Sequence, residues 1–128
     1  MNPRALPHLN LWRGIGRVLI AIMLVVALLP MPRGIGAVPF GDKIGHFLAF
    51  GGLVIWYAQI YSLLPDRCRC MLGAVALGAL IELLQMGVPY RSAEAMDLLA
   101  DALGAGLGLV LASTPLGSVL SRLDVRRV

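Results

Sequence analysis

The chain has 128 residues, of which 59% are hydrophobic and only 14% are charged. Soluble domains average about 45–50% apolar and about 25% charged residues, and a soluble domain of this length could not cover so much apolar surface with its own core. The net charge of +4 comes from basic residues at the ends of apolar runs, and aromatic residues make up 6%. Because a basic face with interleaved aromatic rings is missing, no nucleic-acid partner is expected.

Four stretches with few or no charges follow one another along the sequence. A membrane-spanning helix needs about 20 mostly apolar residues, and these stretches meet or approach that length. We therefore predict an all-α fold: a small polytopic transmembrane helical bundle of about four spans, forming a single domain over residues 1–128. The predicted spans are about 15–32, 43–64, 70–88 and 97–119.

The first stretch also fits a secretory signal peptide. The arginines before it would form the charged region, residues 18–29 the apolar core, and residues 35–37 (Ile-Gly-Ala) the cleavage site. We favour a helix that is retained and that ends at Pro30 and Pro32, because proline interrupts helices. Both interpretations stay open from the sequence alone.

The lysines and arginines predict the orientation of the bundle. Of the 11 basic residues, all but Arg33, Lys43 and Arg91 lie in the N-terminal segment, the 66–69 connection or the C-terminal tail. The positive-inside rule then places both termini and the 66–69 connection in the cytoplasm. The expected location is the bacterial cytoplasmic (inner) membrane, which the chain would cross several times.

Two cysteines, Cys68 and Cys70, lie in or beside the 66–69 connection. They are too close together for a framework disulfide, and in the cytoplasm the default is a pair of reduced thiols. Palmitoylation near the membrane is an alternative. Two thiols do not complete a metal site, and the sequence predicts neither a metal nor a cofactor.

Ionisable residues inside apolar spans are energetically costly, and here they cluster near the predicted outer ends of the spans. Several share a helix face, because they are three or four residues apart. The inferred topology brings them into one layer, so we predict one polar site or network there. Its residues are Asp42, Lys43, His46, Glu82, Gln85, Arg91, Ser92, Asp97 and Asp101.

Each of these residues also has a structural interpretation. Asp42 and Asp97 would cap the helices that they begin. Glu82 would be a neutral acid that is hydrogen-bonded to Gln85 or to a neighbouring helix. Small residues recur every four positions in the last span and predict tight helix packing. They are Ala100, Gly104 and Gly108.

The polar residues resemble the signature of the VanZ-like membrane protein family. The matching pieces, in order over about residues 40–110, are Asp42-Lys43 with His46 and Phe47, Glu82 with Gln85, Arg91-Ser92, Asp97 and Gly104. The family pattern often has asparagine where this chain has Asp101, so an uncharged hydrogen-bonding role is in doubt there. The family takes its name from a protein associated with low-level teicoplanin resistance. The resemblance implies a cell-envelope function and supplies no reaction.

Three functions fit this pattern. The first is binding of an anionic lipid or lipid-linked envelope precursor, in which Lys43 and Arg91 hold phosphate or carboxylate. The second is an enzyme acting on such a head group. His46 or Glu82 would be its general base, and His46 with carboxylates could hold a divalent metal, although no ligand spacing predicts one. The third is a non-catalytic subunit, stabilised by an internal salt-bridge network, in a homo-oligomer or membrane complex.

Overall fold

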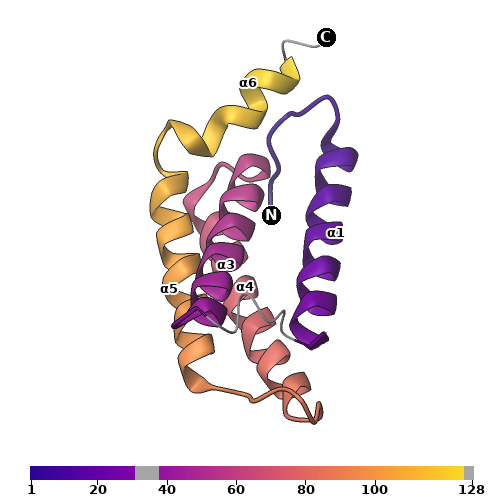
Figure 1. Ribbon diagram of the computed structural model, residues 1–128. Coiled ribbons are helices and arrows are strands. Elements are labelled where there is room, and N and C mark those ends of the chain that lie inside the picture. Colours follow the sequence, from indigo (N-terminus) through magenta and orange to yellow (C-terminus); the bar gives the residue numbers. More distant parts are fainter. Residues whose placement is uncertain (31–37, 126–128) are drawn as a thin grey trace.

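The computed structural model describes residues 1–30 and 38–125 and is helical throughout its main elements. Four long helices alternate in direction (Figure 1). A 3-10 turn and a short helix follow at the end of the bundle where α3 ends and α4 begins, and the N-terminal segment lies at the same end. The elements are α1 (Leu9–Leu28), α3 (Gly41–Ile60), α4 (Leu64–Gln85), α5 (Ala95–Ala112), η1 (Pro115–Ser118) and α6 (Val119–Val125).

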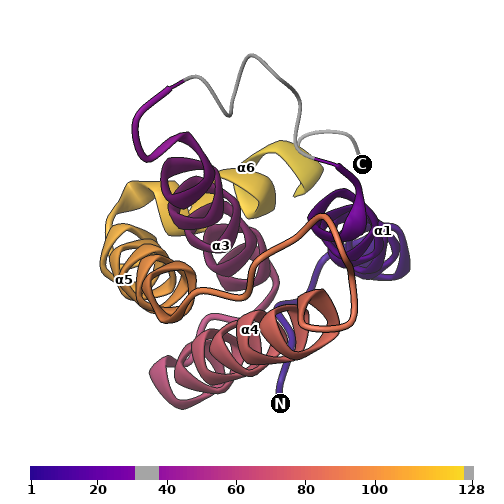
Figure 2. The ribbon, with the colours of Figure 1, turned by 60° about the horizontal axis from the view of Figure 1, so that its bottom comes forward.

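Three of the long helices, α1, α4 and α5, are long and apolar enough to cross a membrane. Helix α3 has 20 residues, as α1 does, but Asp42, Lys43 and His46 lower its hydropathy. It contacts all three other long helices (Figure 2), so its polar side chains can pair with theirs. The all-helical membrane fold is confirmed, and a fourth span at α3 stays a prediction.

The outer surface of the bundle is covered with large apolar side chains. Val25, Leu83 and Val110 have 58%, 66% and 64% of their surface exposed. In water such exposure forgoes about 25 cal/mol for each Å² of apolar surface left unburied, whereas lipid solvates it without that loss. The surface therefore fits a protein whose solvent is the hydrocarbon of a bilayer.

The helix ends differ from the predicted spans where proline determines them. Helix α4 begins at Leu64 with Pro65 in its first turn, a position that suits proline because the missing N–H is not needed there. Residues 66–69 therefore belong to a helix, and predicting a connection there was wrong. Helix α5 ends at Ala112 because Pro115 starts a separate 3-10 turn, so the predicted span to residue 119 was too long.

Helix α1 begins at Leu9 and ends at Leu28, before the first of the two prolines. Ala27 belongs to the buried core together with Phe50 and Ile81. Helix α1 thus packs as part of the bundle, as the favoured interpretation of a retained helix requires. The alternative cleavage site, residues 35–37, lies outside the described residues.

Helices α3 and α5 pack closely because glycines face the opposite backbone. A Cβ at Gly104 would overlap the carbonyl group of Phe47, and a Cβ at Gly108 would overlap that of Gly51. The predicted packing role of Gly104 and Gly108 is confirmed, since only small residues let two helix backbones come this near. We call this contact the glycine seam.

Replacing Gly104 with alanine should destabilise the bundle, because the added methyl group has no space beside Phe47. We expect a loss of about 1–3 kcal/mol in unfolding free energy, as for other overpacked sites. Gly106→Ala is the matched control, since a Cβ there meets nothing within 4 Å and alanine favours the helix by up to about 1 kcal/mol. Thermal unfolding in detergent measures both variants, and equal melting temperatures would contradict the glycine seam.

Candidate functional site at the polar end of the bundle

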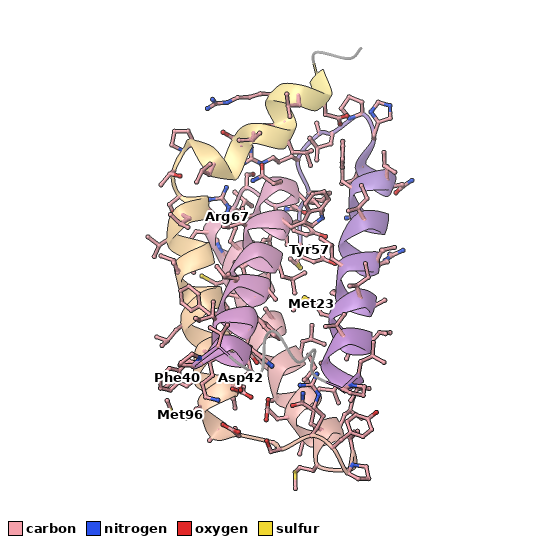
Figure 3. The ribbon with its side chains drawn as sticks, in the orientation of Figure 1. Met23, Phe40, Asp42, Tyr57, Arg67 and Met96 are labelled. Carbon is pink, nitrogen blue, oxygen red and sulfur yellow. The ribbon has the colours of Figure 1, made fainter. Side chains whose placement is uncertain are left out.

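Every site residue predicted from the sequence lies at one end of the bundle, where α1 and α4 end and α3 and α5 begin. Figure 3 shows carboxylate oxygens around Asp42 at this end and Arg67 near the opposite one. We call the end that carries Asp42 the polar end. Its residues, including one that the sequence reasoning missed, are Asp42, Lys43, His46, Glu82, Gln85, Arg91, Ser92, Glu94, Asp97 and Asp101.

Lys43 is the centre of a cluster of ion pairs. Its Nζ lies 2.7 Å from Glu94, 3.0 Å from Asp42 and 3.0 Å from Asp97, and its side chain is only 18% exposed. The hydrogen bond from this ammonium holds the pKa of the Glu94 carboxyl below its ordinary value. Because three carboxylates already surround it, Lys43 is poorly suited to the predicted role of binding a ligand's phosphate.

His46 is held by a buried carboxylate across the glycine seam. Its Nδ1 lies 2.8 Å from Oδ1 of Asp101, which is completely buried, and its ring stacks on Phe50 with centroids 6.2 Å apart. An ionised carboxylate only accepts hydrogen bonds, so Nδ1–H donates to it, and in the neutral imidazole Nε2 then keeps a free lone pair. Asp101 fits only because Gly78 opposite it has no side chain, and a Cβ there would overlap the carboxylate.

Glu82 joins the end of α4 to the start of α5. Its Oε2 accepts a hydrogen bond of 2.8 Å from the backbone N–H of Glu94. Its Oε1 is buried and has no hydrogen-bond partner among the described residues, and the whole residue is 9% exposed. Of the two predicted partners, Gln85 does not bond to Glu82, whereas the neighbouring helix does, through the N-cap residue of α5.

Gln85 and Arg91 instead hold the end of α1. Gln85 Nε2 donates to the carbonyl of Ala27 at 2.9 Å, and an Arg91 nitrogen donates to that of Val26 at 3.1 Å. The last carbonyls of a helix lack intrahelical donors, and a cation there also favours the helix dipole. Both residues therefore have a structural contact that the sequence did not predict.

The acids at the start of α3 and α5 form no N-cap hydrogen bond, so that part of the predicted capping was wrong, but both lie in the first turn, where the expected interaction with the helix dipole is favourable. The N-cap residues are Phe40 and Glu94, and neither helix has a side-chain cap. Asp42 and Asp97 lie in the first turns and pair with Lys43. Glu94 also accepts a hydrogen bond of 3.2 Å from Ser92. Glu94 was missed because an acid before a helix usually faces solvent.

A cavity of about 500 Å³ lies between α1, α3 and α4 beside these polar groups. Its walls are mostly apolar, and Met23 points into it from α1 (Figure 3). Asp42, His46 and Arg91 supply its polar rim. An apolar cavity with a few convergent polar groups is the usual form of a small-molecule site.

The model of the VanZ/LLP1 family matches residues 5–118, which include all four long helices and the polar end. The chain belongs to the VanZ/LLP1 family. No curated protein and no solved structure matches this VanZ-like chain.

Replacing Lys43 with methionine should destabilise the VanZ-like bundle, because Asp42, Glu94 and Asp97 would lose their shared cation. Removing one partner from a buried ion pair costs roughly 3–5 kcal/mol, and we expect about 3 kcal/mol because Glu94 is half exposed. Arg122→Met is the control, since Arg122 is exposed and has no ion pair among the described residues. Chemical or thermal unfolding compares the stabilities of the two variants. If both lose the same unfolding free energy, the ion pairs of Lys43 contribute no stability.

Proposed function

We propose that this VanZ-like protein binds an anionic amphiphile, such as a phospholipid or a lipid-linked envelope precursor, in the bacterial cytoplasmic membrane. The observation that carries the proposal is the cavity of about 500 Å³ with apolar walls and with His46 and Arg91 at its rim. An acyl or prenyl chain would occupy the apolar part. The head group would lie at the polar end, on the outer side of the membrane.

The head group, and not the hydrocarbon chain, has to supply the specificity. Burying a CH₂ group from water contributes about 0.8 kcal/mol, but a lipid chain that leaves the bilayer for the cavity exchanges one apolar environment for another. Its net gain is therefore small. Polar contacts at the rim determine which amphiphile binds.

Arg91 is the cation best placed for that contact. Lys43 is already surrounded by three carboxylates, whereas the guanidinium of Arg91 uses one nitrogen on the carbonyl of Val26. Its Nε is buried and has no hydrogen-bond partner among the described residues. Arginine binds phosphate or carboxylate through two parallel hydrogen bonds, so Arg91 would hold the anionic group.

The family supports a ligand of the cell envelope. The protein after which it is named is associated with low-level teicoplanin resistance, and a lipid-linked envelope precursor is a ligand that would connect this chain to the same phenotype. We propose this connection on family membership together with the cavity. A common phospholipid would satisfy the same chemistry, and lipid identification distinguishes the two.

Filling the cavity should remove the bound lipid. Gly45 lines the cavity, and a Cβ there meets nothing within 4 Å, so Gly45→Leu would project a side chain into the space. Gly52→Leu is the matched control on the same helix, because Gly52 is exposed and lies outside the cavity. We expect native mass spectrometry and lipid extraction to find one enriched anionic lipid class with the wild type and Gly52→Leu, and little with Gly45→Leu.

Arg91→Gln tests the head-group contact in the same preparations. It should retain lipid while losing the preference for anionic classes. No enriched lipid in several wild-type preparations would contradict the proposal. A lower melting temperature of Arg91→Gln, with no change in bound lipid, would indicate the purely structural role.

A second candidate function is catalysis on the bound head group. The observation that favours it is the contact between His46 and Asp101, since a carboxylate that orients a histidine through Nδ1 leaves Nε2 available as a general base. Conversion of the co-purified lipid by wild-type protein, abolished in His46→Ala, would establish the enzyme in place of the binding protein.

The proposed orientation has a separate test. In a background without Cys68 and Cys70, Ser92→Cys should react with a membrane-impermeant thiol reagent only from outside the cytoplasmic membrane, because the positive-inside rule places the polar end there. Ser118→Cys, at the opposite end, should react only after the membrane is opened. The reverse pattern in intact cells would invert the topology.

A further inference from the structure

One group of side chains at the polar end has the composition of a metal site. A ring nitrogen of His46 and one carboxylate oxygen each of Glu82 and Asp97 lie within 4.8 Å of one another. Ligands of one Zn²⁺ ion, at 2.0–2.2 Å from it, lie about 3.5 Å apart. The three side chains come from three different helices, so binding an ion would require their ligand atoms to come closer together.

His46 is oriented as a metal-binding histidine is. Histidines that bind metals generally donate their second ring N–H to a carboxylate or carbonyl, which holds the ring and makes the free nitrogen more basic. Asp101 is such a carboxylate, 2.8 Å from Nδ1 and completely buried. This contact leaves Nε2 as the nitrogen that would bind an ion.

Glu82 supplies independent support for an ion. Its Oε1 is buried without a hydrogen-bond partner among the described residues, and the whole residue is only 9% exposed. An unpaired buried polar atom is costly, and a carboxylate oxygen is compensated most strongly by a cation. Among the described residues the other oxygen accepts one hydrogen bond, from the N–H of Glu94, and this neutral donor does not neutralise an ionised carboxylate.

The local charges also favour a cation. Among the described residues, the polar end has five acids, Asp42, Glu82, Glu94, Asp97 and Asp101, against Lys43 and Arg91. A neighbouring acidic group, Asp42 with Glu94 and Asp97, already holds the Lys43 ammonium and needs no ion. In the described part of the chain, no Lys or Arg side chain forms an ion pair with Glu82, and Lys43 contacts Asp97 of the group of His46, Glu82 and Asp97 from one side.

We propose that His46, Glu82 and Asp97 bind one divalent transition-metal ion, of the kind of Zn²⁺ or Mn²⁺, and that Asp101 positions His46 for it. A mixed set of one imidazole and two carboxylates suits these ions better than Mg²⁺ or Ca²⁺, which prefer oxygen ligands alone. The metal site does not depend on the lipid cavity and is tested without added lipid. Because His46 also lines the cavity, the ion would lie beside the proposed head-group position.

The experiment measures metal bound to the full-length protein without a polyhistidine tag. Cys68 and Cys70 are replaced with serine throughout, so that their thiols cannot bind the metal. Protein in detergent is treated with a chelator, equilibrated with Zn²⁺, Mn²⁺ or Mg²⁺, and desalted. We expect plasma mass spectrometry to find about one Zn²⁺ or Mn²⁺ ion per chain and little Mg²⁺, as for a site with three protein ligands.

The variants His46→Ala and Glu82→Gln should reduce the bound metal to background. His8→Ala is the matched control. His8 also contacts a buried acid, Asp124, at 2.7 Å, but it belongs to neither of the possible metal-binding groups among the described residues. Zn²⁺ should also raise the melting temperature of the starting protein, which is the chain with Cys68 and Cys70 replaced by serine. It should not raise that of Glu82→Gln, because a ligand that binds only the folded state stabilises that state.

Asp101→Asn tests the positioning role. Loss of a carboxylate behind a ligating histidine weakens metal binding by about 10–100-fold, which competition with a chromogenic chelator measures. Asp124→Asn should leave the affinity unchanged.

Two results would overturn the site. One is folded starting protein that retains neither Zn²⁺ nor Mn²⁺, and the other is equal metal content in His46→Ala, Glu82→Gln and the starting protein. If the variants fail to fold, the starting protein's metal content still decides the question. Metal binding without lipid enrichment would refute only the proposed function, and lipid enrichment without metal would refute only the metal site.

Discussion

The close approach of α3 and α5 at the glycine seam is the constraint on which the other features depend. Gly104 and Gly108 bring the two backbones together, and this contact places His46 opposite Asp101 and Lys43 opposite Asp97. Helix α3 carries too many polar residues to face lipid, but beside α5 those residues find partners. The same small side chains thus explain both the packing of the bundle and how it accommodates charge.

The charges at the polar end fall into two groups with different consequences. Around Lys43, one ammonium bridges the carboxylate of Asp42 on α3 and those of Glu94 and Asp97 at the start of α5, so this group mainly joins α3 to α5. In the other group, His46 lines the cavity, and Oε1 of Glu82 is buried without a hydrogen-bond partner among the described residues. Buried groups without partners are energetically costly, and such groups are commonly found where a protein binds or reacts with something else.

Much of this arrangement follows from periodicity and composition. The apolar runs predict the long helices, and the i, i+4 spacing of Asp97 and Asp101, in phase with Gly104 and Gly108, predicts a face that packs against another helix, which the structure shows to be α3. Hydrogen-bond partners could not be predicted, because they depend on helix rotation and on the path of the connections. Gln85 and Glu82 share a helix face, yet one contacts α1 and the other the start of α5. Glu94 lies outside every apolar run, where nothing in the pattern marks it.

Helix α1 forms one wall of the cavity and, among the described residues, does not pack against α5. Substitutions at cavity-lining positions such as Ile22, Met23 and Val26 would therefore reshape the space without touching the glycine seam or the contacts of Lys43. The fold separates a framework, α3 with α5, from an adjustable wall. Under the proposed function, substitutions in α1 would change the shape of the ligand site while the polar end stays the same.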